Sequence, residues 1–255
     1  MLRLAANLSM LFTEVPLEDR FARAAAAGFR AVEVQFPYSL AKERVADLLA
    51  ANGLSLTLIN LAAGDLQAGE RGLALEGGTR FDAAVAQALD YAGTTDCAKV
   101  HAMIGNGALD PPRLAPRLKT AARRFAERGI TMLLEPLNRL DEPAYALTSL
   151  AEAEALRAAI GEANVRIQFD AYHAARSGLY PRAAFAAHRN AIGHVQVADP
   201  PDRGEPTSQT MQDFLGMLEE NGWPDPVGAE YRPRSRTEEG LDWAAPWFGG
   251  SGAGG

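Results

Sequence analysis

Four short apolar runs in the second half of the chain carry an oxygen-bearing side chain at or near their carboxyl ends: Glu135, Asp170, Gln196 and Glu230. A buried parallel strand is a near-continuous apolar run. Pro136 cannot donate to a strand ladder, so the strand before it stops there. A carboxylate in this position lies at the edge of a core, where its charge costs free energy unless it has a partner.

Three carboxylates that converge on one pocket repel one another unless a cation neutralises them. An all-oxygen ligand set suits a hard divalent ion such as Mg²⁺ or Mn²⁺ better than zinc. The alternative is that each acid caps a helix or pairs locally on the surface. Because the pattern repeats on four successive strands, it favours a divalent-metal site.

Histidines and arginines supply further candidates. His173 follows Asp170 by three residues on the expected loop side, and we expect it to contact substrate. His101 and His194 lie within expected strands, where a hydrogen-bonded core histidine is the simpler interpretation. Arg71 and Arg203 lie on loops that follow strands. Either can clamp a carboxylate or phosphate, with a solvated loop cation as the alternative.

The elements that must position these residues recur regularly. Apolar runs predict eight strands, at Leu2–Asn7, Ala31–Phe36, Ser55–Asn60, Ala98–Ile104, Ile130–Leu134, Val165–Phe169, Ile192–Ala198 and Val227–Glu230. Amphipathic patterns between them predict helices. One has a capping-box-like start at Thr79, one begins at Ser149, a short one covers Arg182–His188, and a last one opens near Thr237.

Eight strands alternating with helices indicate an α/β fold, a single-domain (β/α)₈ TIM barrel over residues 1–248. An open doubly wound sheet is the competing fold, but no Gly-x-Gly-x-x-Gly follows the first strand. The long connection Asn60–Gly78 predicts a lid or binding loop on the active-site face. The Gly-rich residues 249–255 predict a flexible tail outside the fold.

The amino-acid composition limits the classes of molecule that this protein is expected to bind. The formal net charge is −7 over 255 residues, which argues against nucleic acid and anionic membranes. An anionic small molecule needs only one or two local cations, and a homo-oligomer is compatible with the sequence. The single Cys97 excludes an internal disulfide framework. With no signal-peptide pattern or apolar span at the N-terminus, we expect a cytoplasmic protein.

Several motifs together resemble the hydroxypyruvate isomerase family, within the xylose-isomerase-like barrels that also contain ketose 3-epimerases. They cover nearly the whole chain: Ala6–Phe12, Phe36–Tyr38, Ala68–Gly72, Glu135–Asn138, Gln168–His173, His194–Asp199, Arg203–Pro206 and Gly228–Tyr231. One segment departs from the family pattern. Where the family continues Gly-Thr-Gly-Glu after Arg-Gly-Glu-Pro, this chain has Thr207-Ser208-Gln209-Thr210.

The resemblance implies an aldose–ketose isomerase that interconverts hydroxypyruvate and tartronate semialdehyde. It implies a divalent metal held by Glu135, Asp170, Gln196 and Glu230, with Glu135 and Glu230 as paired proton donor and acceptor. On this hypothesis Arg71 holds the substrate carboxylate, His173 contacts a substrate oxygen, and Arg203 is a further substrate-binding residue.

Alternatives remain open from the sequence. A 2-oxo-tetronate isomerase or a ketose 3-epimerase would use the same machinery with a different pocket. A metal-dependent abasic-site nuclease needs more histidine ligands and a basic face than this chain provides. The altered loop at Thr207–Thr210 leaves room for a non-catalytic sugar- or acid-binding barrel.

Overall fold

The computed structural model describes residues 1–248. The expected tail, residues 249–255, lies outside the described residues. Eight parallel strands close into a barrel in sequence order. They are β1 (Leu4–Asn7), β2 (Ala31–Glu33), β3 (Ser55–Asn60), β4 (Lys99–His101), β5 (Thr131–Leu134), β6 (Val165–Asp170), β7 (Ile192–Val197) and β8 (Val227–Ala229).

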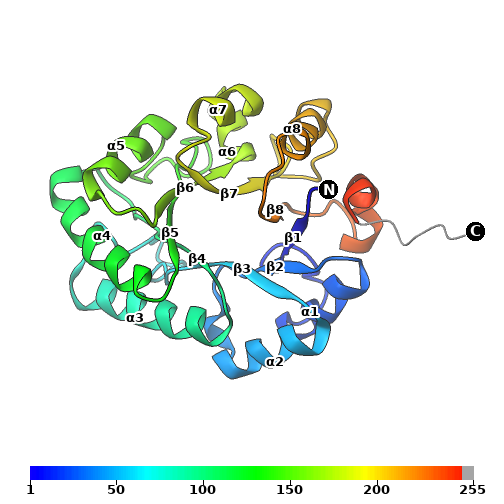
Figure 1. Cartoon of the computed structure of the whole chain (residues 1–255), viewed down its shortest axis with the longest axis horizontal. Helices are drawn as coiled ribbons and strands as arrows, with labels where there is room; N and C mark the ends of the chain where they lie inside the picture. Colours follow the sequence, from blue (N-terminus) through cyan, green and yellow to red (C-terminus); the bar gives the residue numbers. More distant parts are fainter. Residues whose placement is uncertain (249–255) are drawn as a thin grey trace, which may run out of the picture.

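The helices form a ring around the strands (Figure 1). They are α1 (Leu17–Ala26), α2 (Lys42–Asn52), α3 (Gly78–Thr94), α4 (Pro111–Ala126), α5 (Leu150–Ile160), α6 (Ala171–Arg176), α7 (Pro181–His188) and α8 (Gln209–Glu220), with 3₁₀ turns η1 (Pro37–Ser39), η2 (Thr237–Gly240) and η3 (Asp242–Trp247). The predicted TIM barrel is confirmed, and the open sheet is excluded because β1 pairs with β8.

Local sequence explains the best-defined helices. Ser149 and Glu152 form a complete capping box at the start of α5, which satisfies backbone donors that no helical bond can reach. In α4 the side chain of Asp110 accepts from the backbone of Arg113, and prolines occupy the first positions, where a missing N–H costs nothing. The apolar face of α4, from Leu114 to Phe125, is buried against the barrel.

Three helix predictions need correction. Thr79 does not cap a helix, because α3 begins at Gly78 and its N-cap residue is Gly77, which has no side chain to accept a hydrogen bond. The expected helix near Thr237 consists only of η2 and η3. The short helix α6 was not predicted, and it places His173 on a helix instead of a loop. Asp170 itself caps α6 by accepting from the backbone of Tyr172, so a single residue both ends β6 and starts α6.

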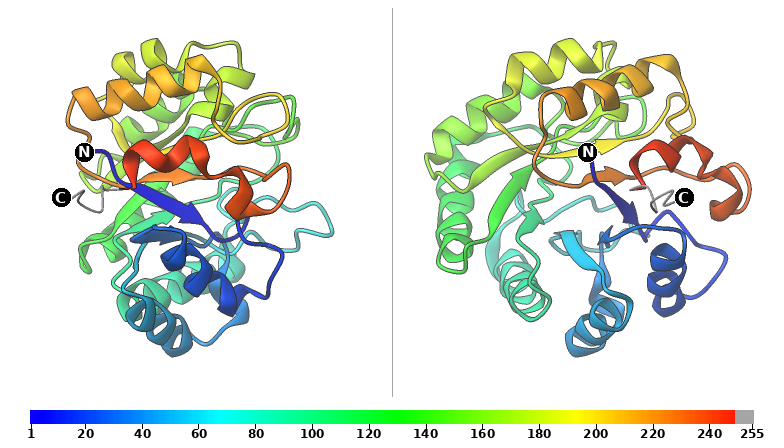
Figure 2. Two further views of the ribbon diagram at one scale, coloured as in Figure 1. Left: turned by 90° about the vertical axis from the view of Figure 1, so that its right-hand side faces the viewer. Right: turned by 45° about the vertical axis from the view of Figure 1, so that its right-hand side comes forward.

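The two ends of the described chain meet at the seam of the barrel. Figure 2 shows η3 beside β1, with β8 next to them. The backbone N–H of Phe12 donates to the hydroxyl of Thr237 at 2.7 Å, and the rings of Phe29 and Phe248 pack edge to face. The turns η2 and η3 therefore cover the side of the barrel where the helix after β8 would lie.

The long connection between β3 and α3, residues 61–77, contains no helix or strand, as expected. It is nevertheless fixed in place, because Gly72 pairs as an isolated bridge with Ile104 beyond β4. Asn106 also donates to the main-chain oxygen of Gly69. No helix among residues 1–248 is long and apolar enough to cross a membrane.

Candidate active site

A cavity of about 740 Å³ opens at the carboxyl ends of the strands. Its wall includes Glu135 after β5, Glu230 after β8, His101 at the end of β4, and His173 and Arg203 from the following segments. In a parallel barrel the carboxyl ends of all strands face the same side. The closed topology therefore brings together groups that are far apart in sequence.

Glu135 is the least satisfied acid of the cavity. Its carboxylate is buried, and its Oε1 has no hydrogen-bond partner among residues 1–248. Its Oε2 lies 3.4 Å from Nδ1 of His101. Burial, and then the nearby charges of Glu230 and Asp170, raise the pKa of Glu135 well above its ordinary value. This group favours its protonated form in the absence of a cation.

Glu230 has a different environment. Its Oε1 accepts from the side-chain amides of Asn7 at 3.0 Å and Gln35 at 2.6 Å. Its Oε2 accepts from Arg203. Burial raises the pKa of Glu230 to about 7, although the Arg203 charge opposes the shift. Charged donors and amides thus support the ionised form of Glu230 more than that of Glu135.

Arg203 lies between the acids. Its Nη2 donates to Oδ2 of Asp170 at 2.7 Å and to Glu230, and its Nε donates to the main-chain oxygen of Glu230 at 3.1 Å. The guanidinium stacks over the ring of Tyr172, 4.6 Å from the centroid. Neighbouring carboxylates raise the pKa of Arg203 despite its burial, so it is a fixed positive charge inside the site.

His173 is oriented by Asn138, whose backbone N–H donates to Nδ1 at 3.1 Å. A neutral imidazole that accepts at Nδ1 carries its proton on Nε2. That Nε2 lies 3.7 Å from Oδ2 of Asp170 and 3.3 Å from Arg203. Burial lowers the pKa of His173 to about 4. The arrangement makes His173 a neutral hydrogen-bond donor toward the cavity.

Gln196 does not line the cavity. It is completely buried in a polar layer beneath the cavity floor, where its amide donates to Glu33 at 2.8 Å and accepts from Gln168 at 2.6 Å. Glu33 also binds Asn7 at 3.2 Å and the ring of His194 at 2.6 Å. His194 is thus a hydrogen-bonded core residue, as expected from the sequence.

Some of the oxygen and nitrogen atoms of the predicted ligands are placed to bind a hard divalent ion, and others are engaged by neighbouring side chains. Glu135, Asp170 and His173 bring one potential ligand atom each within 4.8 Å of one another, and the free, buried Oε1 of Glu135 lacks any other partner. Two features limit the predicted set. The amide oxygen of Gln196 is engaged by Gln168, and Arg203 occupies oxygens of Asp170 and Glu230.

Arg71 lies on the same cavity wall but has a partner of its own. Its Nε donates to the carboxylate of Glu142 at 3.1 and 3.2 Å, and both side chains are about 30% exposed. The pair joins the loop of residues 61–77 to the segment after β5. Arg71 therefore lies at the solvent-exposed mouth of the cavity, whereas Arg203 is buried inside it.

Sequence reasoning missed several residues of the site. Asn7 and Gln35 orient Glu230. The expectation that His101 is a hydrogen-bonded core residue is wrong, because it lines the cavity and neither ring nitrogen is hydrogen-bonded within the described chain. The signal was available, because Asn7 and His101 are the last residues of β1 and β4. Polar residues at the ends of the first four strands therefore contribute to the site as those of the last four do.

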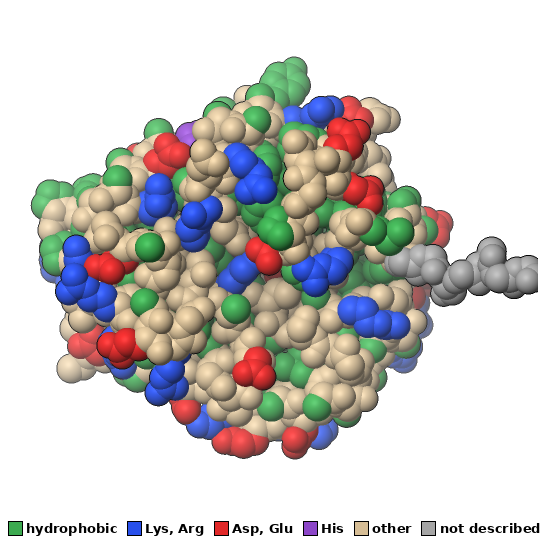
Figure 3. All heavy atoms as spheres, in the orientation of Figure 1, with side chains coloured by type: hydrophobic (Ala, Val, Ile, Leu, Met, Phe, Trp, Pro, Cys, Tyr) green, Lys and Arg blue, Asp and Glu red, His purple; other side chains and the backbone are tan. Residues whose placement is uncertain are grey.

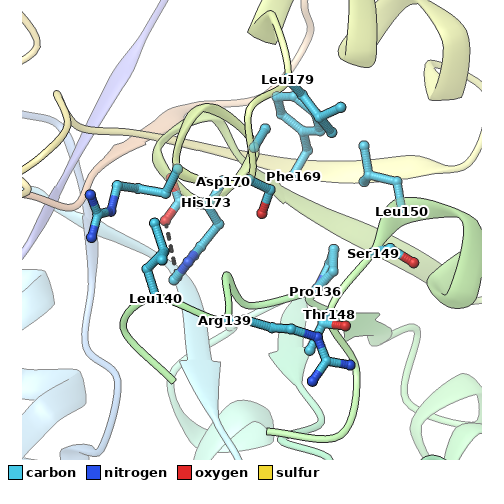
Figure 4. Close-up of a pocket in the computed structure, with 13 residues that line it drawn as sticks. Pro136, Arg139, Leu140, Thr148, Ser149, Leu150, Phe169, Asp170, His173 and Leu179 are labelled. Carbon is cyan, nitrogen blue, oxygen red and sulfur yellow. Dashed lines mark ion pairs between the residues drawn. The ribbon is translucent and has the colours of Figure 1, made fainter. Parts of the chain in front are cut away.

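The segment that departs from the family pattern, Thr207–Thr210, is held by local hydrogen bonds. Ser208 caps α8 through its hydroxyl, and the carboxylate of Asp199 accepts from the backbones of Thr207 and Ser208. A second cavity of about 510 Å³ lies on the far side of His173 (Figure 4). Leu150, Phe169 and Leu179 make much of its wall apolar.

Comparison with known proteins agrees with the barrel fold. Residues 21–247 match the family described as xylose isomerase-like TIM barrel. The chain is 40% identical to 2-oxo-tetronate isomerase of Cupriavidus necator, covering 97% of this chain and 99% of the relative. It is 39% identical to hydroxypyruvate isomerase of Escherichia coli, covering 97% and 100%.

A solved structure is also similar over its whole length. The crystal structure titled AP endonuclease, family 2, from Brucella melitensis has a TM-score of 0.92 and 39% identity, covering 97% of this chain and 99% of the other. Full-length similarity to relatives named as isomerases, together with the buried acids of one cavity, assigns the chain to a class of enzymes. The chain belongs to the hydroxypyruvate isomerase family of xylose isomerase-like TIM barrels.

Proposed function

We propose that this isomerase interconverts hydroxypyruvate and tartronate semialdehyde by proton transfer between Glu135 and Glu230. The observation that carries the proposal is that these two buried carboxylates, which follow β5 and β8, border one cavity, where the charge of Glu230 helps to raise the pKa of Glu135. An acid–base pair of this kind can exchange protons with a substrate held between its members.

The asymmetry between the two acids suggests their order of action. Glu230 accepts from three side chains, which favours its ionised form and a role as base at carbon three. Glu135 has a buried Oε1 without a hydrogen-bond partner in the described chain and returns a proton to carbon two. The hydroxyl proton passes from the oxygen of carbon three to that of carbon two, so the reaction neither gains nor loses atoms.

Other residues fix the substrate. Arg71 pairs with the substrate carboxylate at the cavity mouth, and the Nε2–H of His173 donates to a substrate oxygen. Arg203 adds a second cationic contact. The two acids have little access to solvent water, because Glu135 is 5% and Glu230 4% exposed.

A divalent ion, Mg²⁺ or Mn²⁺, would be held by Glu135, Asp170 and Glu230, with Gln196 joining only if its amide turns from Gln168. When bound, it would stabilise the negative charge that develops on the substrate oxygens. The unpartnered Oε1 of Glu135 supports this assignment. The tautomer of His173 favours a substrate contact over a metal bond for that residue.

A four-carbon acid is a second candidate substrate. One relative is named 2-oxo-tetronate isomerase, and its identity to this chain is as high as that of the hydroxypyruvate isomerase. The cavity of about 740 Å³ also exceeds the volume of a three-carbon acid. An abasic-site nuclease activity is less well supported, because the net charge is −7 and acidic and basic side chains are interspersed on the face in Figure 3.

The test is isomerisation of both acids in D₂O, followed by NMR, with and without chelator. We expect deuterium at carbon two or three and loss of turnover on chelation, restored by Mn²⁺. Glu135→Gln should lower kcat by about 10²–10⁴-fold, the usual contribution of a positioned acid or base. Glu127→Gln, an exposed carboxylate at the end of α4, is the matched control. Near-normal kcat in Glu135→Gln would refute the assignment.

A further inference from the structure

We infer that Arg203 is a resident cation that bridges the acidic ligands in the metal-free enzyme, and that a divalent ion must displace its guanidinium in order to bind. This inference rests on the divalent-metal site of the proposed function. It adds that the affinity for the ion is set by competition with a side chain of the protein itself.

The contacts identify the competitor. One guanidinium nitrogen, Nη2, binds both Oδ2 of Asp170 and Oε2 of Glu230. Its neighbour Nη1 lies 3.3 Å from Nε2 of His173. Arg203 thus engages oxygens from β6 and β8 that a cation between those strands would need. Glu135, the remaining acid, is the one that Arg203 leaves without a bond.

Charge explains why a cation is present there. Glu135, Asp170 and Glu230 are each at most 5% exposed. Arg203 is the only Lys or Arg in the buried part of residues 1–248. A buried carboxylate without a counter-charge is strongly destabilising. A single guanidinium cannot balance three carboxylates, whereas a divalent ion and the guanidinium together can. The ion therefore shifts Arg203 aside without requiring it to leave the cavity.

The backbone of Arg203 is fixed, so the displacement must occur in its side chain. Its φ of +56° is held by a bond from the backbone of Arg232 to its carbonyl at 2.7 Å, and by pairing of Asp199 with Gly204. The long side chain can swing from this anchor across the ring of Tyr172. Its expected role in substrate binding also requires donors that Asp170 and Glu230 now occupy.

The experiment measures Mn²⁺ binding to chelator-stripped protein by the EPR signal of free Mn²⁺. Arg203→Met removes the competitor and should tighten Mn²⁺ binding by about tenfold or more, because a neighbouring positive charge is lost from a buried site. Arg203→Lys keeps the charge but loses the Nε bond to the main-chain oxygen of Glu230, so it should tighten binding by a smaller factor. Arg232→Met removes an exposed arginine of the same cavity and should leave the affinity within about twofold.

The outcomes separate the two proposals. Weaker or unchanged Mn²⁺ binding in both Arg203 variants would overturn the displacement and show that Arg203 supports the ligands instead. No Mn²⁺ binding by any variant would overturn the metal site of the proposed function as well. If Arg203→Met does not fold without metal, Arg203→Lys, which retains the charge, decides the question.

Discussion

At the scale of single residues, the two catalytic candidates differ in how they are held. Glu230 is fixed by Asn7, Gln35 and Arg203, whereas Glu135 has an oxygen free of any described partner. Asn7 is central because one amide group bonds both Glu230 and Glu33. It links the cavity to the polar layer below and orients the carboxylate that faces the substrate.

Replacing Asn7 by Ala should therefore damage catalysis more than binding. Two buried carboxylates lose a donor, which should lower the free energy of unfolding by about 1–3 kcal/mol. With Glu230 less well positioned, kcat should fall by about tenfold or more while KM changes little. Steady-state kinetics and denaturant unfolding check both parts. A change in KM alone would instead place Asn7 in substrate binding.

At the scale of elements, the barrel strands supply the acids and the long loop of residues 61–77 supplies Arg71. The loop is positioned by close backbone contact. A Cβ on Gly72, at φ +132°, would lie 2.4 Å from the main-chain oxygen of Met103. Only glycine fits there, since any side chain would force the loop off β4.

Gly72→Ala should release the loop and misplace Arg71. We expect kcat/KM for an anionic substrate to fall by about ten- to a hundredfold, as is typical when a binding group shifts by an ångström. Hydrogen exchange of residues 61–77 should accelerate. Gly69→Ala is the matched control, because its φ is also positive but a Cβ there meets no atom within 4 Å. Equal effects of both variants would mean that backbone strain, not contact with Met103, is responsible.

At the scale of the whole molecule, buried titrating groups make stability depend on pH. The raised pKa values of Glu135 and Glu230 stabilise the fold while these groups hold protons. This contribution is lost as pH rises above 4.5, and for Glu230 the loss extends through about 7. The lowered pKa values of His101, about 3, and His173, about 4, contribute stability that is complete above 6.5 and lost as pH falls below it.

These opposing effects nearly cancel between about pH 4.5 and 6.5, so we predict that the metal-free protein has nearly constant stability over that range and is less stable at pH 8, where only the carboxylates act. Melting temperatures of chelator-treated protein across roughly pH 5.5 to 8 test this prediction. Glu135→Gln should flatten the decline above pH 6.5, because it removes one buried charge. A wild-type melting temperature that rises up to pH 8 would contradict the prediction.

Much of the architecture was determined by the sequence. Apolar runs at regular spacing define eight strands, and strand ends carry the acids, because parallel strands buried on both faces must be apolar until they leave the core. The sequence predicted the starts of the helices less accurately than the strands. A capping pattern at Thr79 looked valid locally, yet the backbone at Gly77 and Gly78 has positive φ and starts α3 without a cap.

The partners of each acid were decided only by the tertiary structure. Gln196 has the right position in sequence for a metal ligand, but its amide meets Glu33 and Gln168 from other strands. Arg203 was a loop cation in the sequence and is the buried bridge between Asp170 and Glu230 in the fold. Local pattern fixes where a strand ends, whereas hydrogen bonds and charge balance depend on neighbours that only barrel closure brings within reach.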